Sequence, residues 1–355
     1  MSCGSHVELL DFDRAELTAE LEQRFGLPAF RARQLIRWVH KFRVKDFSEM
    51  TDIAKPLREA FDDAYTIYRP ELAERQVSRD GTRKYLFRLS DGSAVESVLI
   101  KQTDRLTLCV SSQVGCAMGC KFCRTALMKL KRNLATHEIV GQVLAVQDDA
   151  AELGEVFNNI VFMGMGEPLH NYDNVMRALR LLNDELGHDF SYRKVTVSTS
   201  GLVPAIERFG QEGAPASLAV SLNATSDDVR SQLIPINKKW PIEKLMSTLR
   251  ELPLNSNRRI TIEYVMLAGV NDTKDDLARL PGILKDVPCK INLIPYNENA
   301  GLGFKRPSRD HIAKWQDRLL SRGFNTTVRW SKGEDIDAAC GQLATANEAK
   351  QAVSG

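Results

Sequence analysis

The sequence predicts an α/β protein: a partial, open parallel β/α barrel of six βα units, with a small N-terminal helical domain and a short β-hairpin extension. Three successive patterns along the 355 residues lead to this prediction. Residues 14–63 have apolar residues at helical spacing, residues 83–100 alternate like strands, and from residue 105 short β-branched runs alternate with amphipathic stretches. The predicted boundaries are 1–65, 66–104, 105–300 and 301–355.

The first two regions have clear local signals. In Phe30–Phe42 the apolar residues recur at helical spacing, and Gly26-Leu27-Pro28 ends the helix before it. Asp80-Gly81 and Asp91-Gly92 are dipeptides typical of hairpin turns. Residues 66–104 are therefore predicted to form the hairpin extension.

The third region alternates strands and helices. The predicted strands are Leu106–Ser111, Asn159–Met163, Lys194–Thr199, Ser217–Leu222, Arg259–Met266 and Lys290–Pro295. Predicted helices cover 137–152, 172–186, 202–210, 241–251, 273–285 and 308–322. Six units are too few to close an eight-fold barrel, so an open one is expected. A further run, Thr326–Trp330, precedes a C-terminal loop that contains Cys340.

Composition excludes several classes of protein. A hydrophobic content of 43% suits a buried core, and no apolar run is long enough to span a bilayer. The N-terminus lacks a signal-peptide pattern, so a cytoplasmic protein without membrane contact is expected. Seven cysteines are too few for a disulfide scaffold and indicate metal or redox chemistry instead. No heptad seam is present, which favours a monomer.

The decisive pattern is Cys116-Ala-Met-Gly-Cys120-Lys-Phe-Cys123, directly after the first strand of the βα series. Three thiolates on one tight loop can ligate three irons of a 4Fe–4S cluster and leave the fourth iron open, whereas electron-transfer clusters use four cysteines. The alternative is a structural zinc site, which usually needs a second ligand pair that the sequence does not show.

These residues, together with Phe122 before the last cysteine, resemble the radical S-adenosylmethionine (SAM) superfamily. Met163-Gly-Met-Gly-Glu-Pro168 resembles the element of that superfamily that contacts the SAM amino group. Further motifs resemble the RlmN/Cfr family of RNA adenine methyltransferases; they cover residues 109–116, 198–201, 237–239, 262–267, 289–297 and 335–343. Pro168 favours the branch that methylates C2 over the Cfr branch, which methylates C8 and usually has Ala there.

The resemblance implies a set of site residues. Cys116, Cys120 and Cys123 would hold one 4Fe–4S cluster. The SAM site would be lined by Gly166, Glu167, Ser198, Ser221, Leu222, Asn223 and Asn297, with Asn223 standing where the family often has His. Cys340 would be the S-methylcysteine intermediate, Cys109 the resolving thiol that pairs with it in a disulfide, and Glu96 the proton acceptor.

The resemblance also implies the reaction. One SAM would methylate Cys340, and a second would yield a 5′-deoxyadenosyl radical that takes hydrogen from the new methyl group. The resulting radical would add to adenine C2, and Cys109 would then release the product. Family substrates are a 23S rRNA adenosine near the peptidyl-transferase centre and the tRNA adenosine next to the anticodon, with a flavodoxin-type electron donor.

Two runs of basic residues are candidates for RNA contact, since phosphate binding needs local positive charge. They contain Arg31, Arg33, Arg37, Lys41 and Arg43 in the N-terminal domain, and Lys129, Lys131 and Arg132 after the cysteine motif. Solvated charged faces are the simpler interpretation of such runs. Other functions stay open: a Cfr-like C8 methyltransferase, a non-catalytic iron–sulfur RNA-binding protein, or a radical SAM enzyme with a small-molecule substrate.

Overall fold

The computed structural model describes residues 6–254, 258–299 and 301–343. Its N-terminal part is helical, as predicted, with α1 (Arg14–Phe25), α2 (Phe30–Ile36) and α3 (Lys55–Ala64). Asp13 starts α1 in a capping box with Glu16, and Gly26 ends it with φ +65°. The second predicted helix changes to π-helical geometry over Arg37–Lys41. Two short strands, β1 (Val7–Glu8) and β2 (Tyr65–Thr66), pair in parallel and bring the two ends of this part together.

The core is a ten-stranded sheet in the order β14-β13-β12-β11-β10-β9-β6-β5-β4-β3. All neighbours from β6 to β14 are parallel, and the ladders among β3, β4, β5 and β6 are antiparallel. The strands are β3 (Glu71–Val77), β4 (Arg83–Arg88), β5 (Ala94–Lys101), β6 (Leu106–Cys109), β9 (Asn159–Phe162), β10 (Val195–Thr199), β11 (Ser217–Ser221), β12 (Ile260–Met266), β13 (Cys289–Pro295) and β14 (Thr326–Val328). The predicted α/β fold with a central parallel sheet is confirmed, and within the described residues no ladder joins β14 back to β6.

Helices follow the parallel strands as crossover connections. They are α5 (Thr136–Glu152), α6 (Tyr172–Asn183), α7 (Val203–Gln211), α8 (Asp227–Leu233), α9 (Ile242–Glu251), α10 (Lys274–Ile283) and α11 (Arg309–Ser321). Several elements have no counterpart among the predicted ones: α8, the short α4 (Arg124–Leu127), strand β3, and the two-residue strands β7 (Gln113–Val114) and β8 (Arg132–Asn133). None of the helices that the structure describes has the length and apolar character of a membrane span.

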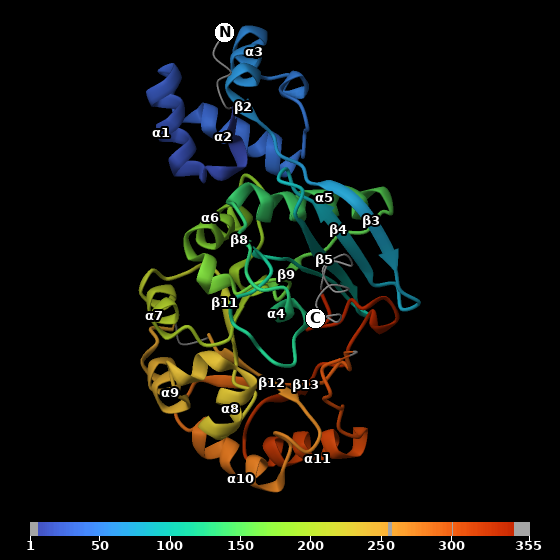
Figure 1. The fold of residues 1–355 in the computed structure, drawn as a ribbon. Coiled ribbons are helices and arrows are strands. Elements are labelled where there is room, and N and C mark those ends of the chain that lie inside the picture. The colour runs from blue at the N-terminus through green and yellow to red at the C-terminus, as the bar shows by residue number, and fades with distance from the viewer. Residues whose placement is uncertain (1–5, 255–257, 300, 344–355) are drawn as a thin grey trace.

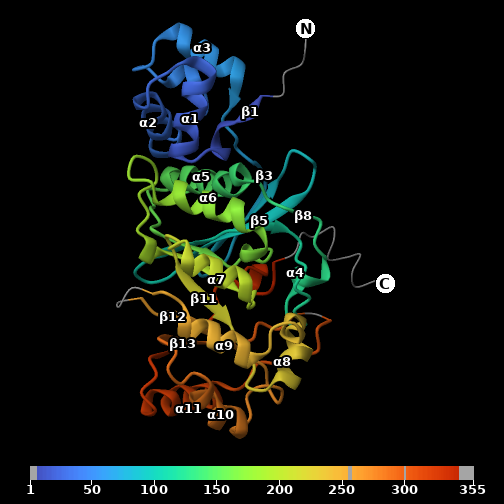
Figure 2. The ribbon, with the colours of Figure 1, turned by 90° about the vertical axis from the view of Figure 1, so that its left-hand side faces the viewer.

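The N-terminal helices lie beyond α5 and α6, on the side away from α10 and α11 (Figures 1 and 2). Ion pairs join the two parts: Arg177 with Glu16, Arg180 with Asp13 and Arg43 with Asp148. The carboxyl ends of the parallel strands face the loop that carries the three clustered cysteines. This is the edge where α/β folds bind ligands.

Candidate radical SAM active site

The loop that carries the cysteines is closed at its base by a short antiparallel ladder. Gln113 pairs with Asn133 and Val114 with Arg132, so residues 115–131 form one excursion from the sheet. Gly115 has φ +75°, and a Cβ there would lie 1.6 Å from the Lys129 carbonyl oxygen. Only glycine lets the entry and exit of the loop come this close.

Cys116, Cys120 and Cys123 line one cavity of about 920 Å³, counted to its open mouth. Burial raises the pKa of all three thiols, that of Cys116 to about 12, and the neighbouring thiolates raise them further. Bound metal ions would favour the thiolate forms of all three. Three thiolates on one short loop suit a cluster in which each thiolate binds a different iron.

The turn after β9 forms the facing wall of this cavity, through Gly164, Gly166 and Glu167. Gly166 has φ +102°, and a Cβ on it would lie 2.5 Å from Gln113 Cβ. The Glu167 carboxylate accepts hydrogen bonds from the Ser200 backbone N–H at 2.8 Å and the Ser200 hydroxyl at 2.9 Å. Burial nevertheless raises the pKa of Glu167, which lies 3% exposed. A cationic ligand group, such as an ammonium, would favour its ionised form.

Two of the predicted SAM-site serines also reach the cavity. Ser198 and Ser221 line it at the ends of β10 and β11. The Ser198 hydroxyl donates to Glu263 Oε2 at 2.7 Å, whereas Oε1 of this buried carboxylate has no protein partner within the described residues. Glu263 also lines the cavity, so its free oxygen is available to a hydroxyl or amine of a ligand.

Leu222 and Asn223 lie behind Ser221 rather than in the cavity lining. Leu222 is fully buried in the core. Asn223 adopts φ +55° and accepts a hydrogen bond from the Val265 backbone N–H at 2.7 Å. The Asn223 Nδ2 is buried and has no partner within the described residues, so contact of these two residues with SAM stays a prediction.

The C-terminal loop brings Cys340 into the same cavity. Asn297 Nδ2 donates to the Cys340 carbonyl at 3.0 Å, and the Arg124 N–H donates to the Gly341 carbonyl at 2.8 Å. The Thr125 hydroxyl donates to the Leu343 carbonyl at 2.7 Å. The loop around Cys340 therefore packs against α4, which directly follows Cys123.

Cys109 is buried at the end of β6 and does not line the cavity itself. Burial raises its pKa to about 12, with the Cys340 thiolate a further cause, while the Arg329 guanidinium acts in the opposite direction. Cys340 and Cys109 both raise the pKa of Arg329. The two predicted catalytic thiols therefore share one electrostatic neighbourhood with this cation.

Glu96 is not brought into the cavity. It lies 4% exposed on β5, with an ion pair from Lys84 at 3.4 Å. It lines a separate polar pocket with Arg124, Asp337 and Gln342. Asp337 and Gln342 flank Cys340 in sequence, so this pocket lies on another side of the C-terminal loop.

Buried side chains fasten the base of the cysteine loop to the turn that contains Glu167. Gln113, fully buried, accepts from the Glu167 N–H at 2.8 Å and donates to Asn133 at 2.8 Å. Asn171 Nδ2 donates to the carbonyls of Ser112 at 2.9 Å and Leu134 at 2.7 Å. We call Gln113 and Asn171 the base clamp. It sets the position of the cluster ligands relative to the predicted SAM turn.

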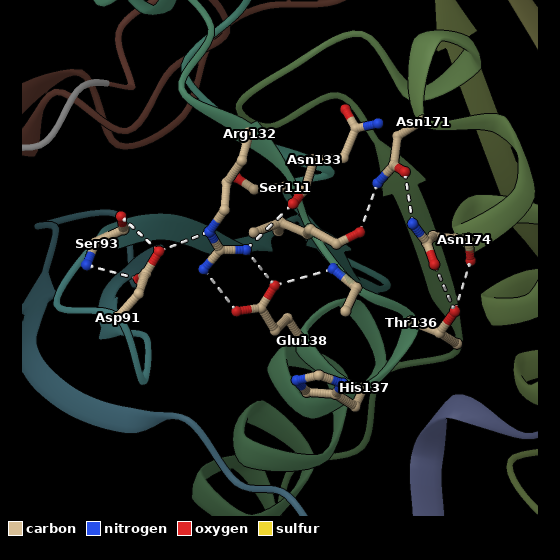
Figure 3. Close-up of polar contacts among 12 residues, drawn as sticks. Asp91, Ser93, Ser111, Arg132, Asn133, Thr136, His137, Glu138, Asn171 and Asn174 are labelled. Atoms are coloured by element: carbon tan, nitrogen blue, oxygen red, sulfur yellow. Dashed lines mark hydrogen bonds and ion pairs between the residues drawn. The ribbon is translucent and has the colours of Figure 1, made fainter. Parts of the chain in front are cut away.

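A second set of contacts holds the exit of the loop (Figure 3). Arg132 donates to both oxygens of Glu138, at 2.7 and 2.8 Å, and to Asp91 of the β4–β5 turn at 2.6 Å. Asn174 donates to Asn171, which links this network to the base clamp. The predicted RNA contact Arg132 is therefore engaged within the protein.

Among the other predicted RNA-contact residues, some also bind to neighbouring parts of the protein and others are exposed to solvent. Arg43 pairs with Asp148 at 2.9 Å and connects the N-terminal part to α5. Arg31 is half-buried and donates to Gln34. The exposed members are Arg33, Arg37, Lys41, Lys129 and Lys131.

Sequence reasoning missed four polar residues at or near the site: Gln113, Asn171, Arg230 and Glu263. Each is buried, at 0%, 2%, 0% and 4% exposure. A signal existed for Glu263, because a lone carboxylate inside the apolar run Ile260–Met266 must have a reason to be buried. The other three lie in a two-residue strand or in short helices, where periodicity gives no expectation.

Comparison with known proteins agrees with this geometry. The model of the ribosomal RNA large subunit methyltransferase N-terminal domain matches residues 7–67, and that of the radical SAM superfamily matches residues 110–280. A dual-specificity RNA methyltransferase RlmN from Geobacter sulfurreducens is 52% identical over 318 residues, 90% of this chain and 87% of the relative. The chain belongs to the RlmN family of radical SAM RNA methyltransferases.

Further RlmN family members and a solved structure support this assignment. The RlmN from Geotalea uraniireducens is 49% identical over 95% of this chain and 96% of its own. A crystal structure of a radical SAM methyltransferase from Sphaerobacter thermophilus superposes with a TM-score of 0.89 at 43% identity, covering 95% of this chain and 99% of that one. Radical SAM membership implies a 4Fe–4S cluster and SAM. The three-thiol cavity with its glycine turn fits both groups.

Proposed function

We propose that the protein methylates C2 of adenosine in 23S rRNA and in tRNA, by way of a methylated Cys340. The observation that carries the proposal is the place of Cys340 in the cavity formed by Cys116, Cys120, Cys123 and Glu167. A thiol beside a SAM site can accept a methyl group. The names of the relatives, dual-specificity RNA methyltransferases, support an RNA substrate of two kinds.

When bound, the cluster and SAM supply the electron and the carbon-radical chemistry that methylation of an electrophilic ring carbon requires. The protein's own residues position them. Cys116, Cys120 and Cys123 would hold the irons, while Glu167 and Gly166 would receive the SAM amino group. Ser198 orients Glu263 through its 2.7 Å hydrogen bond, which leaves Oε1 for another polar group of SAM.

Cys340 and Cys109 act in different steps of the proposed reaction. The Cys340 sulfur attacks the SAM methyl carbon and loses its proton, and this carbon later becomes bonded to C2 of the base. The Cys109 thiolate then attacks the Cys340 sulfur and forms a disulfide with it as the sulfur–carbon bond breaks. The electron pair of that bond goes to the carbon, which takes up a proton and becomes the new methyl group. Glu96 receives the C2 proton; its pocket also contains Asp337 and Gln342, which flank Cys340.

RNA binds across the exposed basic residues of the N-terminal part and of the cysteine loop. Arg33, Arg37 and Lys41 are exposed, and Arg37 lies over the ring of exposed Phe42 at 5.1 Å. A cation beside an aromatic face suits phosphate contact and base stacking together. Arg43 and Arg132 instead form ion pairs within the protein, with Asp148 and Glu138. We further propose that residues 1–65 form the RNA-binding domain and that the enzyme is a cytoplasmic monomer. Each methylated product would consume two SAM molecules, and a flavodoxin-type protein would donate the electrons.

The test is anaerobic reconstitution with SAM, a reductant and 23S rRNA or tRNA fragments, followed by nucleoside mass spectrometry. We expect 2-methyladenosine at one position in each RNA. If 8-methyladenosine forms instead, the enzyme is Cfr-like. RNA binding without SAM cleavage would mean a non-catalytic iron–sulfur protein.

A further inference from the structure

Trp330 is an exposed aromatic side chain near the loop that carries Cys340. All four tryptophans lie in the described ranges, and Trp330 is the exposed one, with 38% of its surface open to solvent. It follows the edge strand β14 along the chain. A single exposed apolar residue is common on protein surfaces, so its surroundings decide whether it has a role.

The residues on both sides of Trp330 are fastened to the protein. The Arg329 N–H donates to a carbonyl of β13 at 2.9 Å. The Ser331 hydroxyl donates to Asn297 Oδ1, and Asn297 Nδ2 donates to the Cys340 carbonyl at 3.0 Å. The backbone that presents the Trp330 ring is therefore fixed, and it is connected through one side chain to the loop of the proposed methyl carrier.

Trp330 and Cys340 line one cavity, of about 360 Å³ counted to its open mouth, together with Lys332. Cys340 also lines the larger cavity that contains the cluster cysteines and Glu167. Cys340 therefore borders both cavities. In the proposed reaction it meets SAM in the larger cavity and must then meet a base of the RNA. The cavity beside Trp330 gives a second side from which RNA can approach.

Cations without carboxylate partners surround the Trp330 ring. The Arg309 guanidinium carbon, on α11, lies 4.7 Å from the ring centroid. Neither Arg309 nor Lys332 forms an ion pair with a carboxylate of the described residues, whereas Arg306, just before α11, is paired with Glu334 at 2.8 Å. Nucleobases stack on aromatic rings and on guanidinium planes, and unpaired cations bind phosphate. The chemistry of this surface therefore fits single-stranded RNA.

We propose that Trp330 stacks on the base next to the target adenosine, while Arg309 and Lys332 contact the phosphates that flank it. An enzyme that reacts with a base atom takes that base out of the stack, and the neighbouring base then loses a stacking partner. Trp330 replaces this partner at a fixed position beside Cys340. The inference rests on the proposed RNA methylation and adds a contact that lies outside both basic runs of the sequence.

The experiment measures the affinity of the full-length, reconstituted protein for an RNA fragment that it methylates, in the absence of SAM so that no turnover occurs. Two further fragments have an abasic nucleotide directly 5′ or 3′ of the target adenosine. Trp330→Ala should bind the intact RNA roughly fivefold to a hundredfold more weakly, the range for loss of one stacked base. With one of the two abasic RNAs it should bind as well as the unmodified protein, because the stacked base is already missing.

Two variants test whether the ring itself matters. Trp330→Phe keeps an aromatic face, and its affinity for intact RNA should stay near that of the unmodified protein. Tyr192→Ala is the matched control, because Tyr192 also lies under a guanidinium, that of Arg258 at 4.2 Å, but precedes β10 at the opposite edge of the sheet. Its removal should leave all three affinities unchanged. Iron and sulfide analysis of each variant shows whether the cluster site is intact.

Unchanged affinity of Trp330→Ala for intact RNA, or an equal loss with the intact and both abasic RNAs, would overturn the proposal. If Trp330→Ala retains no iron, Trp330→Leu, which keeps an apolar side chain but no ring, decides by the same comparison. Either negative result in a protein that methylates the intact fragment would refute only the role of Trp330. An unmodified protein that methylates no fragment would contradict the proposed function and this inference with it.

Discussion

The two loops that carry four of the five functional thiols are held in different ways. The loop of residues 115–131, with the three cluster cysteines, is fastened at its base by fully buried Gln113, by Asn171 and by the bidentate Arg132–Glu138 pair. The loop around Cys340 is held by backbone carbonyls and by an ion pair between Arg124 and Asp337, whose side chains are 26% and 59% exposed. The first arrangement suits ligands that must keep one geometry. The second suits a thiol that must meet SAM and then RNA.

The largest expected effect comes from the rigid loop. Replacing Cys116, Cys120 or Cys123 by Ala should abolish the 4Fe–4S absorbance and all SAM cleavage, since three thiolates are the minimum set that leaves one iron open. Iron and sulfide analysis with detection of 5′-deoxyadenosine measures both. Cys289→Ala is the control, because that buried thiol starts β13 outside the cavity. A triple variant that still binds four irons would show that these cysteines are not the cluster ligands, and the comparison of the two loops would fail.

The next prediction separates the two thiols outside the rigid loop. Cys109→Ala should still accept a methyl group on Cys340 and attack adenine, but release should stall, because the resolving thiol is missing. We expect a protein–RNA adduct that survives denaturation and that is absent in the Cys109→Ala, Cys340→Ala double variant. Normal turnover in Cys109→Ala would mean that Cys109 only packs the core. An adduct in the double variant would show that another residue carries the methyl group.

These thiols also show what sequence can and cannot establish. The succession of strands and helices, the open parallel sheet and the position of the cysteine motif directly after the first strand of the βα series follow from periodicity and spacing, because both report on local structure. The roles of Cys109 and Cys340 came from family resemblance; they are 231 positions apart in sequence, and no local pattern joins them. Gln113 and Arg230 were missed because they lie in a two-residue strand and a seven-residue helix, which are too short to show a period, and a buried polar residue there can be recognised only when its partners are known.

The base clamp predicts an intermediate effect. Gln113→Ala leaves the Glu167 N–H and the Asn133 side chain without their buried partner, at a cost of about 1–3 kcal/mol. SAM affinity should fall by roughly tenfold to a hundredfold while the cluster is retained. Titration of the change that SAM causes in the electron paramagnetic resonance spectrum of the reduced cluster measures this directly.

Gln142→Ala is the matched control for the clamp. Gln142 is also fully buried, and its hydrogen bonds go to Ser97, Ser111 and Glu138 rather than to the cysteine loop or to Glu167. We expect it to lower the thermal midpoint of unfolding but to leave the SAM titration unchanged. Equal loss of SAM affinity in both variants would show that general destabilisation, not the clamp, controls the SAM site.

The smallest effect is expected at the contact between the two loops. Arg124→Ala removes the 3.2 Å ion pair with Asp337 but keeps the Arg124 N–H bond to the Gly341 carbonyl. Half-exposed ion pairs contribute roughly 0–1 kcal/mol, so the rate of Cys340 methylation should fall less than about tenfold. The deficit should shrink as salt is raised, because salt already screens the pair in the unmodified protein. Lys305→Ala, which breaks an exposed pair with Glu298 at 3.0 Å, is the control and should change nothing. Complete loss of Cys340 methylation in Arg124→Ala would mean that this loop needs a fixed position as much as the cysteine loop does, and the contrast between the two loops would fail.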